Sequence, residues 1–549
     1  MTVRIFFVKA NSLEMTKQKA CNSIQLGIVV VIILCTGFFQ CRSFANDDKT
    51  IAALSDYLKN LRLLEAVQHT IAKQPNILLD EWQVKVNEGL WQIQRGTFNT
   101  TVSTSVSDTL THTPLTRSVR ASNGTSESVS RVTGYTMDIS KEFRSGVELT
   151  PDITMSSTED LATNVHTTNF ATVTFAIKIP LLRERGRAAN AADETSAKIL
   201  TESSRYDLNY TTSQSILTTV NEYWNTVAAM DNLEIAEKAE SRAKYMLEQT
   251  KILVDAGEQP ASDINKLAAN LHGKTSSRIN KTQELFEARQ TLGLAMGLRF
   301  DEIVATPLPS EPLLDVDDAD LNKIPIAQGL IDIGLERRAD LIALKKEQES
   351  TNVLMVGAQK NLKPQLDFDL DVGYIGLTED VRRQRNTRQY ASAINSREAG
   401  LNFTAMFSLE WPVMNDFRRG TYLRRRALNE RAIIDTNNLT RQIVSNIVVA
   451  MSDVIQSAAE LKKAHESVLV YQTAVQKERL KLKLGESTII DLIDVDDRLT
   501  TAMETEVSAR LSYAKALVQL RFETGTILSP DLKNISVSMK ELTTVPSAN

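Results

Sequence analysis

Two very long stretches without glycine or proline constrain the fold of this chain more than any other feature. One runs from Arg187 to Ala256, and the other, of 64 residues, runs from Thr421 to Leu484. Glycine and proline interrupt helices, so each stretch can form one helix. A helix of 64 residues is about 96 Å long, whereas an ordinary helix has about 11–12 residues. The chain is therefore predicted to be organised around helices of unusual length.

A short turn containing glycine follows each stretch. Glycine readily takes the left-handed conformation that ends a helix, so the chain is predicted to reverse there and return as a second helix. Both turns read Gly-Glu, four residues, then Asp and an aliphatic residue. The turn residues are Gly257, Glu258 and Asp263 in the first copy and Gly485, Glu486 and Asp491 in the second.

The second half of the chain repeats the plan of the first: helix, strands, very long helix, turn, helix. Pro180 and Pro412 close the last strand of each half, and Gly186 and Gly420 precede the long helices. A repeat of roughly 200 residues is far longer than a solenoid unit, so it indicates a duplicated half. The predicted parts are a signal peptide (1–45), a first repeat (46–306), a linker (307–327), a second repeat (328–527) and a C-terminal tail (528–549).

Between the helices, apolar and polar residues alternate as in a β-strand. Segments with one apolar face and one polar face suit either a half-buried sheet or a membrane barrel with a wet interior. On this pattern Asp367, Asp369 and Asp371 either line a lumen or face solvent on a sheet. The alternating segments are 100–108, 135–140, 147–155, 171–179, 366–374 and 401–411, with polar loops expected at 113–129 and 157–167.

The N-terminus has the pattern of a cleaved secretory signal. Lys17 and Lys19 precede an apolar run, 26–39, which the small-x-small segment Ser43-Phe44-Ala45 follows. A membrane anchor is the alternative, but it needs about 20 apolar residues. An exported chain that has lost this segment has no thiol for a disulfide, because the cysteines are Cys21, Cys35 and Cys41.

Several classes of function are excluded by what the sequence lacks. A formal charge of −5 and the absence of a basic tract with interleaved aromatic residues argue against nucleic-acid binding. The five histidines show no ligand spacing, so neither a metal nor another cofactor is predicted. No Gly-x-Ser-x-Gly motif, phosphate loop or pair of catalytic carboxylates is recognisable. The chain is predicted not to be an enzyme.

The second long helix carries an apolar seam with coiled-coil spacing. A lone hairpin of this length cannot bury its seam, so helices of both repeats, or of several chains, are predicted to pack into a tube or bundle. The seam residues are Val444, Ile447, Met451, Val454 or Ile455, Ala458 and Leu461.

These features together resemble the TolC family of outer membrane efflux proteins. The resemblance covers roughly residues 60 to 527, and it is sharpest at the two turns and at the motif Asp491-Leu492-Ile493-Asp494. The segment Pro180-Leu181-Leu182-Arg183 is similar to the strand-to-helix junction of many members. The resemblance implies a mainly α protein with a β-barrel part: a homotrimer whose strands form one barrel and whose helices form a coiled-coil periplasmic tunnel.

The function that this resemblance implies is an exit duct in the outer membrane. Such a duct serves a tripartite efflux or type I secretion system and passes substrates from an inner-membrane pump to the exterior. An adaptor protein is expected to contact the turn residues Gly257, Glu258, Gly485 and Glu486. The alternative is a structural or adhesive coiled-coil surface protein without a pore, which does not need its alternating segments to form a closed barrel in lipid.

The resemblance also implies a gate at the turns. Asp491 and Asp494 match the aspartates that ring the family's tunnel entrance, and Asp263 is retained as their first-repeat partner. Six carboxylates from three chains are expected to favour cations and to raise some carboxyl pKa values by repulsion.

Two departures from the family pattern concern this gate and the barrel. Ser487 stands where some members carry an arginine that locks the tip, and Leu482 where they carry a tyrosine. We hypothesise that Lys266 replaces the arginine by pairing with Asp491 or Asp494. The hairpin around Gly146 is extra relative to the family's four strands per chain, so either the barrel is wider or this hairpin lies outside it.

Overall fold

The computed structural model describes residues 61–161, 167–257, 259–316, 327–380, 388–395, 399–528 and 537–546. All of them belong to one compact unit of the chain, residues 59–549. The predicted signal peptide, residues 1–45, and the turn residue Glu258 lie outside the described residues.

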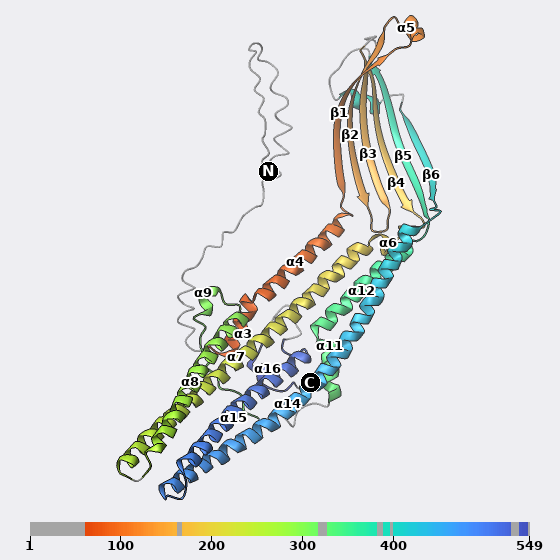
Figure 1. The fold of residues 1–549 in the computed structure, drawn as a ribbon. Coiled ribbons are helices and arrows are strands. Elements are labelled where there is room, and N and C mark those ends of the chain that lie inside the picture. Colours follow the sequence, from red (N-terminus) through yellow and green to blue (C-terminus); the bar gives the residue numbers. More distant parts are fainter. Residues whose placement is uncertain are drawn as a thin grey trace, which may run out of the picture. The chain divides into compact units, whose positions relative to one another are not determined.

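The first half contains a broken helix and a long helical hairpin (Figure 1). Helix α3, Leu63–Lys73, is separated from α4, Pro75–Gly96, by a break, because Pro75 occupies the first position of α4. Helix α7, Ala192–Asp255, has 64 residues, and α8, Ser262–Ala295, returns along it. Helix α7 confirms the prediction from the stretch without glycine and proline, except that the first turn, α6, Arg187–Asn190, is separated from it at Ala191. Helix α8 confirms the predicted return after the glycine turn.

The second half follows the same plan. Helices α11, Ala327–Arg337, and α12, Ala339–Lys360, precede the strands, and α14, Asp416–Lys483, runs for 68 residues before α15, Ile489–Glu523. The prediction that Gly420 precedes the long helix is wrong, because α14 begins at Asp416. A glycine inside a helix costs only about 1 kcal/mol, which the packing of so long a helix exceeds.

The remaining helices are short. Within the described ranges, no helix combines the length and the apolar character needed to cross a bilayer. The short helices are α5 (Arg117–Asn123), α6 (Arg187–Asn190), α9 (Phe300–Ile303), α13 (Arg388–Ile394) and α16 (Met539–Thr543).

Six antiparallel strands form one sheet in the order β1-β2-β3-β4-β5-β6 (Figure 1). The two sequence repeats therefore share a sheet, since β4 of the first half pairs with β5 of the second. The expected loops at 113–129 and 157–167 are shorter than predicted, because paired strands continue into these Ser/Thr-rich segments. The strands are β1 (Thr101–Pro114), β2 (Glu127–Glu142), β3 (Glu148–Asp160), β4 (Thr167–Pro180), β5 (Gln365–Asp380) and β6 (Gly400–Glu410).

The register gives the sheet one largely apolar face and one largely polar face. Residues directly paired across antiparallel strands share a face. One row across the sheet is therefore apolar, and a second row on the opposite face is polar. The apolar pairs include Val106 with Tyr135, Tyr135 with Met155, Phe175 with Val372 and Phe368 with Phe407, and the polar pairs include Ser103 with Asp138, Asp138 with Asp152 and Asp152 with Thr174.

The helices pack at two levels along the molecule. Near the sheet, α7 lies between α4 and α12, and α14 lies beside α12; toward the turns, α7 lies beside α8 and α15, and α14 beside α15. Helices α7 and α14 thus run through both levels, whereas shorter helices complete each level (Figure 1). Apolar clusters lie between these helices, one around Trp224 of α7 and another around Ile447 of α14.

Most residues of the predicted apolar seam of α14 are buried. Ile447, Val454, Ala458 and Leu461 are buried, whereas Ile455 is 51% exposed, so Val454 is the seam residue of the pair that the prediction left open. The buried stripe also takes in Ile443, Ala450 and Ala464. Alanines in this stripe let α14 approach its neighbours closely.

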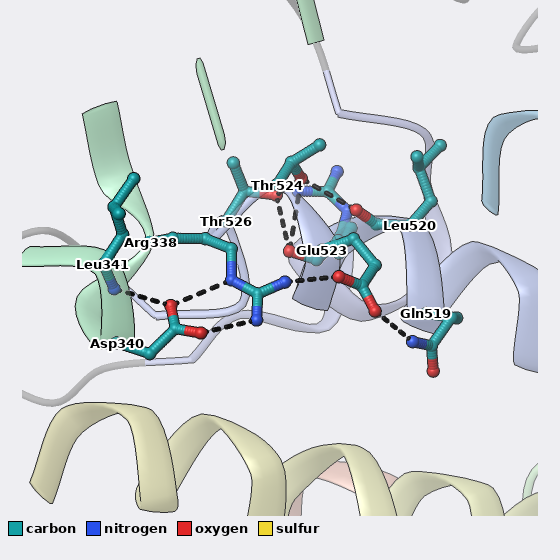
Figure 2. A network of polar contacts seen from close by, with 9 residues as sticks. Arg338, Asp340, Leu341, Gln519, Leu520, Glu523, Thr524 and Thr526 are labelled. Atoms are coloured by element: carbon teal, nitrogen blue, oxygen red, sulfur yellow. Dashed lines mark hydrogen bonds and ion pairs between the residues drawn. The ribbon is translucent and has the colours of Figure 1, made fainter. Parts of the chain in front are cut away.

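A buried ionic network joins the start of α12 to the end of α15 (Figure 2). The Arg338 guanidinium is 6% exposed; its Nε and Nη2 donate to the Asp340 carboxylate at 3.0 and 2.7 Å, and its Nη1 donates to Glu523. Glu523 also accepts a hydrogen bond from Gln519 at 2.7 Å. This network fixes the point where α12, which packs near the sheet, meets α15, which packs toward the turns.

The beginning of the linker is hydrogen-bonded to Leu61, just before α3. The backbone N–H of Leu61 donates to the Leu308 carbonyl at 3.0 Å, and the N–H of Ser310 donates to the Leu61 carbonyl at 3.0 Å. Linker residues 317–326 lie outside the described residues.

Candidate functional site

The two helical turns have the predicted backbone conformation. Gly257 has a φ of 79° and Gly485 a φ of 75°, both in the left-handed region. The Gly257 N–H donates to the Val254 carbonyl at 2.9 Å, and the Glu486 N–H donates to the Lys481 carbonyl at 2.9 Å. These bonds satisfy carbonyls at the helix ends that otherwise have no partner.

We expect Gly485→Ala to destabilise the protein by about 1–2 kcal/mol, because a side chain makes the left-handed conformation unfavourable. Gly420→Ala is the matched control. An added Cβ meets no atom within 4 Å at either position, but Gly420 is helical, so alanine there is expected to stabilise by up to about 1 kcal/mol. Opposite shifts of the unfolding temperature are expected, and shifts of the same sign contradict this explanation of the turn.

Asp491 caps its own helix. Its carboxylate accepts bonds from the Thr488 hydroxyl at 2.6 Å and from the Thr488 N–H at 3.1 Å, and its own N–H donates to the Thr488 hydroxyl at 3.3 Å. The Thr488 hydroxyl and N–H stabilise the charged form and lower the pKa of Asp491. Within one chain this effect is opposite in sign to the repulsion expected from three chains.

The hypothesised pairs of Lys266 with Asp491 or Asp494 do not form within the chain. Lys266 Nζ lies 2.9 Å from Asp263 Oδ1, and Asp494 pairs with Arg498 Nε at 2.9 Å. Residues three or four apart on one helix are neighbours on its surface, so each charge finds a partner on its own helix. Lys266 therefore neutralises the first-repeat aspartate of the same turn.

Ser487, the residue at the family's arginine position, ties the second turn to α14. Its hydroxyl donates to the Glu478 carboxylate, which also pairs with Lys481 at 3.0 Å. The Ser487 hydrogen bond, with help from Lys481, lowers the pKa of Glu478. The serine thus stabilises the turn within the chain.

An apolar cluster holds the two turns together. Leu247 of α7, Leu267 of α8 and Ile489 of α15 are buried in it, and Leu482 of α14 packs against them. All four helices therefore meet just above the turns. Leu482, which stands where some family members carry a tyrosine, contributes here to apolar packing.

Three polar contacts between the hairpins were missed by reasoning from the sequence. Arg242 Nε of α7 lies 2.8 Å from Asp496 Oδ1 of α15, and its Nη2 donates to the Thr500 hydroxyl at 2.9 Å. Lys274 Nζ of α8 lies 2.7 Å from Asp497 Oδ1. Asp496 and Asp497 lie one residue beyond the Asp491–Asp494 motif, but a sequence pattern does not identify their partners 254 and 223 residues away.

The three aspartates of β5 lie on the polar face of the sheet. Asp367 is buried, and its Oδ2 lies 3.2 Å from Lys178 Nζ of β4 and accepts a bond from Gln365 at 2.6 Å. Asp369 accepts a bond from Ser408 of β6 at 3.3 Å. Two of the three carboxylates thus have partners on neighbouring strands. Their position in a lumen remains a prediction.

No group of three or more metal-ligating side chains occurs in the part of the chain that the structure describes. The described polar residues at the turns form ion pairs, hydrogen bonds and helix caps.

Two comparisons with known proteins give matches. No family model matches the chain. The outer membrane protein TolC of Vibrio cholerae is 21% identical over 341 residues, covering 61% of this chain and 73% of that protein. TolC of Salmonella enteritidis is 20% identical over 346 residues, covering 62% and 68%.

Solved structures match over more of the chain. The CmeC outer membrane channel of Campylobacter jejuni covers 94% of both chains with a TM-score of 0.60 and 14% identity. The outer membrane protein VceC of Vibrio cholerae covers 84% of this chain and 96% of its own, with a TM-score of 0.60 and 12% identity. The two-faced sheet and paired long hairpins are therefore the fold of an outer membrane channel protein.

The TolC proteins that match are 20–21% identical over more than half of this chain. In sequence the chain is thus similar to proteins of the TolC family, as its turns and strands indicated.

Proposed function

We propose that this protein is the outer membrane exit duct of a tripartite efflux or type I secretion system. Substrates delivered by an inner-membrane pump pass through a tunnel of its helices and leave through a barrel of its strands. The two-faced sheet carries this proposal, since one face suits lipid and the other suits a wet lumen. The duct itself performs no catalytic chemistry, and its energy comes from the pump.

A homotrimer is supported by the edges of the single chain. The edge strands β1 and β6 each pair on one side only. Helix α4 leads into β1, and β6 leads into α14. Each of the two flanks of the chain therefore has one edge strand with unpaired backbone groups and one helix beside it. Five apolar residues spaced three or four apart on α4 are each at least half exposed: Leu79, Trp82, Val86, Leu90 and Ile93.

The opposite flank is also apolar. Phe417, Leu423 and Ile434 of α14 are at least 66% exposed. A head-to-tail contact of one flank with the other flank of the next chain closes into a ring, pairs the strand edges and covers both helices. The arrangement removes the exposed edges that make an open sheet prone to aggregation.

The surroundings follow from this arrangement. The apolar sheet face contacts outer membrane lipid, and helices of about 100 Å extend through the periplasm toward the inner membrane. The turns at Gly257 and Gly485, with Glu258 and Glu486 beside them, contact a periplasmic adaptor protein. Export of the chain through a signal peptide at residues 1–45 completes the proposal.

The tunnel entrance is proposed at Asp491 and Asp494, with Asp263 and Lys266 beside it. In a trimer the carboxylates of these two positions form rings that attract cations. Asp494 is 56% exposed, and Arg498 balances its charge only partly, so the ring retains a negative field.

The test is the single-channel current of the purified trimer in a planar bilayer. We expect small cation-selective currents, and we expect Asp491→Asn/Asp494→Asn to reduce the selectivity and raise the conductance several-fold. Glu284→Gln, an exposed acidic position on α8, is the matched control and is expected to leave both unchanged. Currents unaffected by the double substitution would move the constriction elsewhere.

The absence of any channel would instead favour the alternative, a structural or adhesive coiled-coil surface protein. The structure offers that alternative no particular support. A surface coiled coil has no need for six strands with a continuous apolar face.

A further inference from the structure

We propose that the extra β2–β3 hairpin is part of the pore wall, so that three copies of the chain close an 18-stranded barrel, six strands from each. This inference rests on the proposed duct function. It concerns how wide the outer membrane part of the duct is.

The hairpin lies within the sheet and not beside it. Strand β2 pairs with β1 from Thr101–Ser140 to Pro114–Glu127, and β3 pairs with β4 from Glu148–Lys178 to Glu159–Thr167. Excluding the hairpin from the wall would break both ladders and leave the inner edges of β1 and β4 unpaired. Each lost backbone bond in lipid costs free energy, so the wall must include the hairpin.

Both faces of the hairpin match those of its neighbours. On the apolar face, Met137 of β2 pairs with Ile153 of β3, which pairs with Val173 of β4. On the polar face, Thr136 pairs with Thr154 of β3, which pairs with Thr172 of β4. A hairpin outside the barrel would have no lipid to contact and no lumen to line, and would not need this alternation.

The turn of the hairpin is fixed to the junction between strand and helix. The Arg144 guanidinium forms two bonds of 2.6 Å with the Glu194 carboxylate of α7. The Gly186 N–H donates to the Ser145 carbonyl at 2.9 Å. Gly146 has a φ of 88°, and a Cβ there would overlap the Glu184 carbonyl oxygen. The turn therefore fits closely against the end of β4.

The width of the sheet supports the same conclusion. The row of helices nearest the sheet, α4-α7-α12-α14, spans about 32–40 Å at interaxial distances of about 8–10 Å. Six strands about 4.8 Å apart and tilted by about 40° span about 38 Å along the barrel wall, whereas four span about 25 Å. When the hairpin is included, the width of the six strands of each chain matches the width of the row of helices that continues them.

The consequence is a barrel about 1.5-fold wider than one with four strands per chain, because barrel diameter grows roughly linearly with strand number. The backbone diameter is then about 36 Å. Bulky substrates therefore meet their narrowest passage at the helical turns and not in the membrane.

A pair of cysteine variants tests which face of the hairpin is wet. In trimers held in lipid nanodiscs, we expect a water-soluble maleimide to label Thr154→Cys at least tenfold faster than Ile153→Cys. The unsubstituted chain is the control for background labelling, since its three cysteines all precede residue 46. Equal labelling of the two positions would place the hairpin outside the wall and overturn the proposal.

Electron cryomicroscopy of the same trimers counts the strands directly. We expect 18 in the unsubstituted protein and 12, with a diameter reduced to about two thirds, when residues 127–166 are deleted and Ser126 is joined to Thr167. A closed barrel of 12 strands in the unsubstituted trimer overturns the inference but leaves the duct intact. A failed duct function gives a different result, with neither a trimer nor a current. If the deletion variant does not fold, the strand count of the unsubstituted protein decides.

Discussion

Arg242→Ala is expected to separate the ends of the two hairpins and to raise the conductance of the duct several-fold. The substitution removes both the ion pair with Asp496 and the hydrogen bond to Thr500. Asp496 is 4% exposed, so its carboxylate is left buried without a cation, which costs about 3 kcal/mol. Moving α15 away from α7 lets water reach this carboxylate. The charge therefore favours the open arrangement once its partner is lost.

The control is Lys238→Ala on the same helix. Lys238 also pairs with an acid, Glu234, but both side chains are about 60% exposed and lie on α7 itself. Exposed pairs of this kind contribute about 0–1 kcal/mol, and the pair does not join two helices. Bilayer currents measured for both variants should differ clearly. Equal currents from Arg242→Ala and the unsubstituted protein would show that the pair does not hold the turns together.

Arg338→Met is expected to give the largest loss of stability, about 3–5 kcal/mol. Methionine fills a similar volume but leaves the carboxylates of Asp340 and Glu523, which share this guanidinium, without their cation. The Arg338 guanidinium also lies over the rings of Tyr210 and Phe522, at 5.8 and 5.3 Å. The expected result is a large fall in the temperature at which the purified protein unfolds.

A second substitution separates the loss of charge pairing from the loss of packing. Adding Glu523→Gln to Arg338→Met removes one of the two uncompensated charges, so part of the stability should return. Arg337→Met, at the exposed neighbouring position, is expected to change the unfolding temperature little. If the double variant is no more stable than Arg338→Met alone, the ring contacts and not the charges account for the loss.

The elements of this fold could be predicted because their signals are local. Gly257 and Gly485 lie at positive φ, Pro75 begins a helix, and Pro180 ends a strand, and each effect depends on the backbone of one residue. Alternation along β5 predicted which residues share a face. Gly420 was misread because a lone glycine resembles a helix boundary, whereas one helical glycine costs too little free energy to end so long a helix.

The pairings could not be predicted, because they depend on elements far apart in the sequence. Lys266 has the right charge to meet Asp494, yet the nearer Asp263 takes it. Arg242 gave no signal of its own, since its partner Asp496 comes from a helix on the other hairpin. The place of the extra hairpin likewise follows from the ladder β1-β2-β3-β4. The alternation of apolar and polar residues along a strand does not determine which strands lie next to each other in the sheet.

Because α7 is unbroken, a small rotation at one point along it gives a large displacement at its end. Trp224 is fully buried in the core of the first half, while the helix continues to Asp255. Those 31 residues form an arm of about 46 Å, so a tilt of about 10° at the core moves the end of the helix by about 8 Å. A force applied at the turns therefore gives a wide displacement from a small rotation of the helix. The spacing of the turns can therefore change with only a small adjustment of the packing around Trp224.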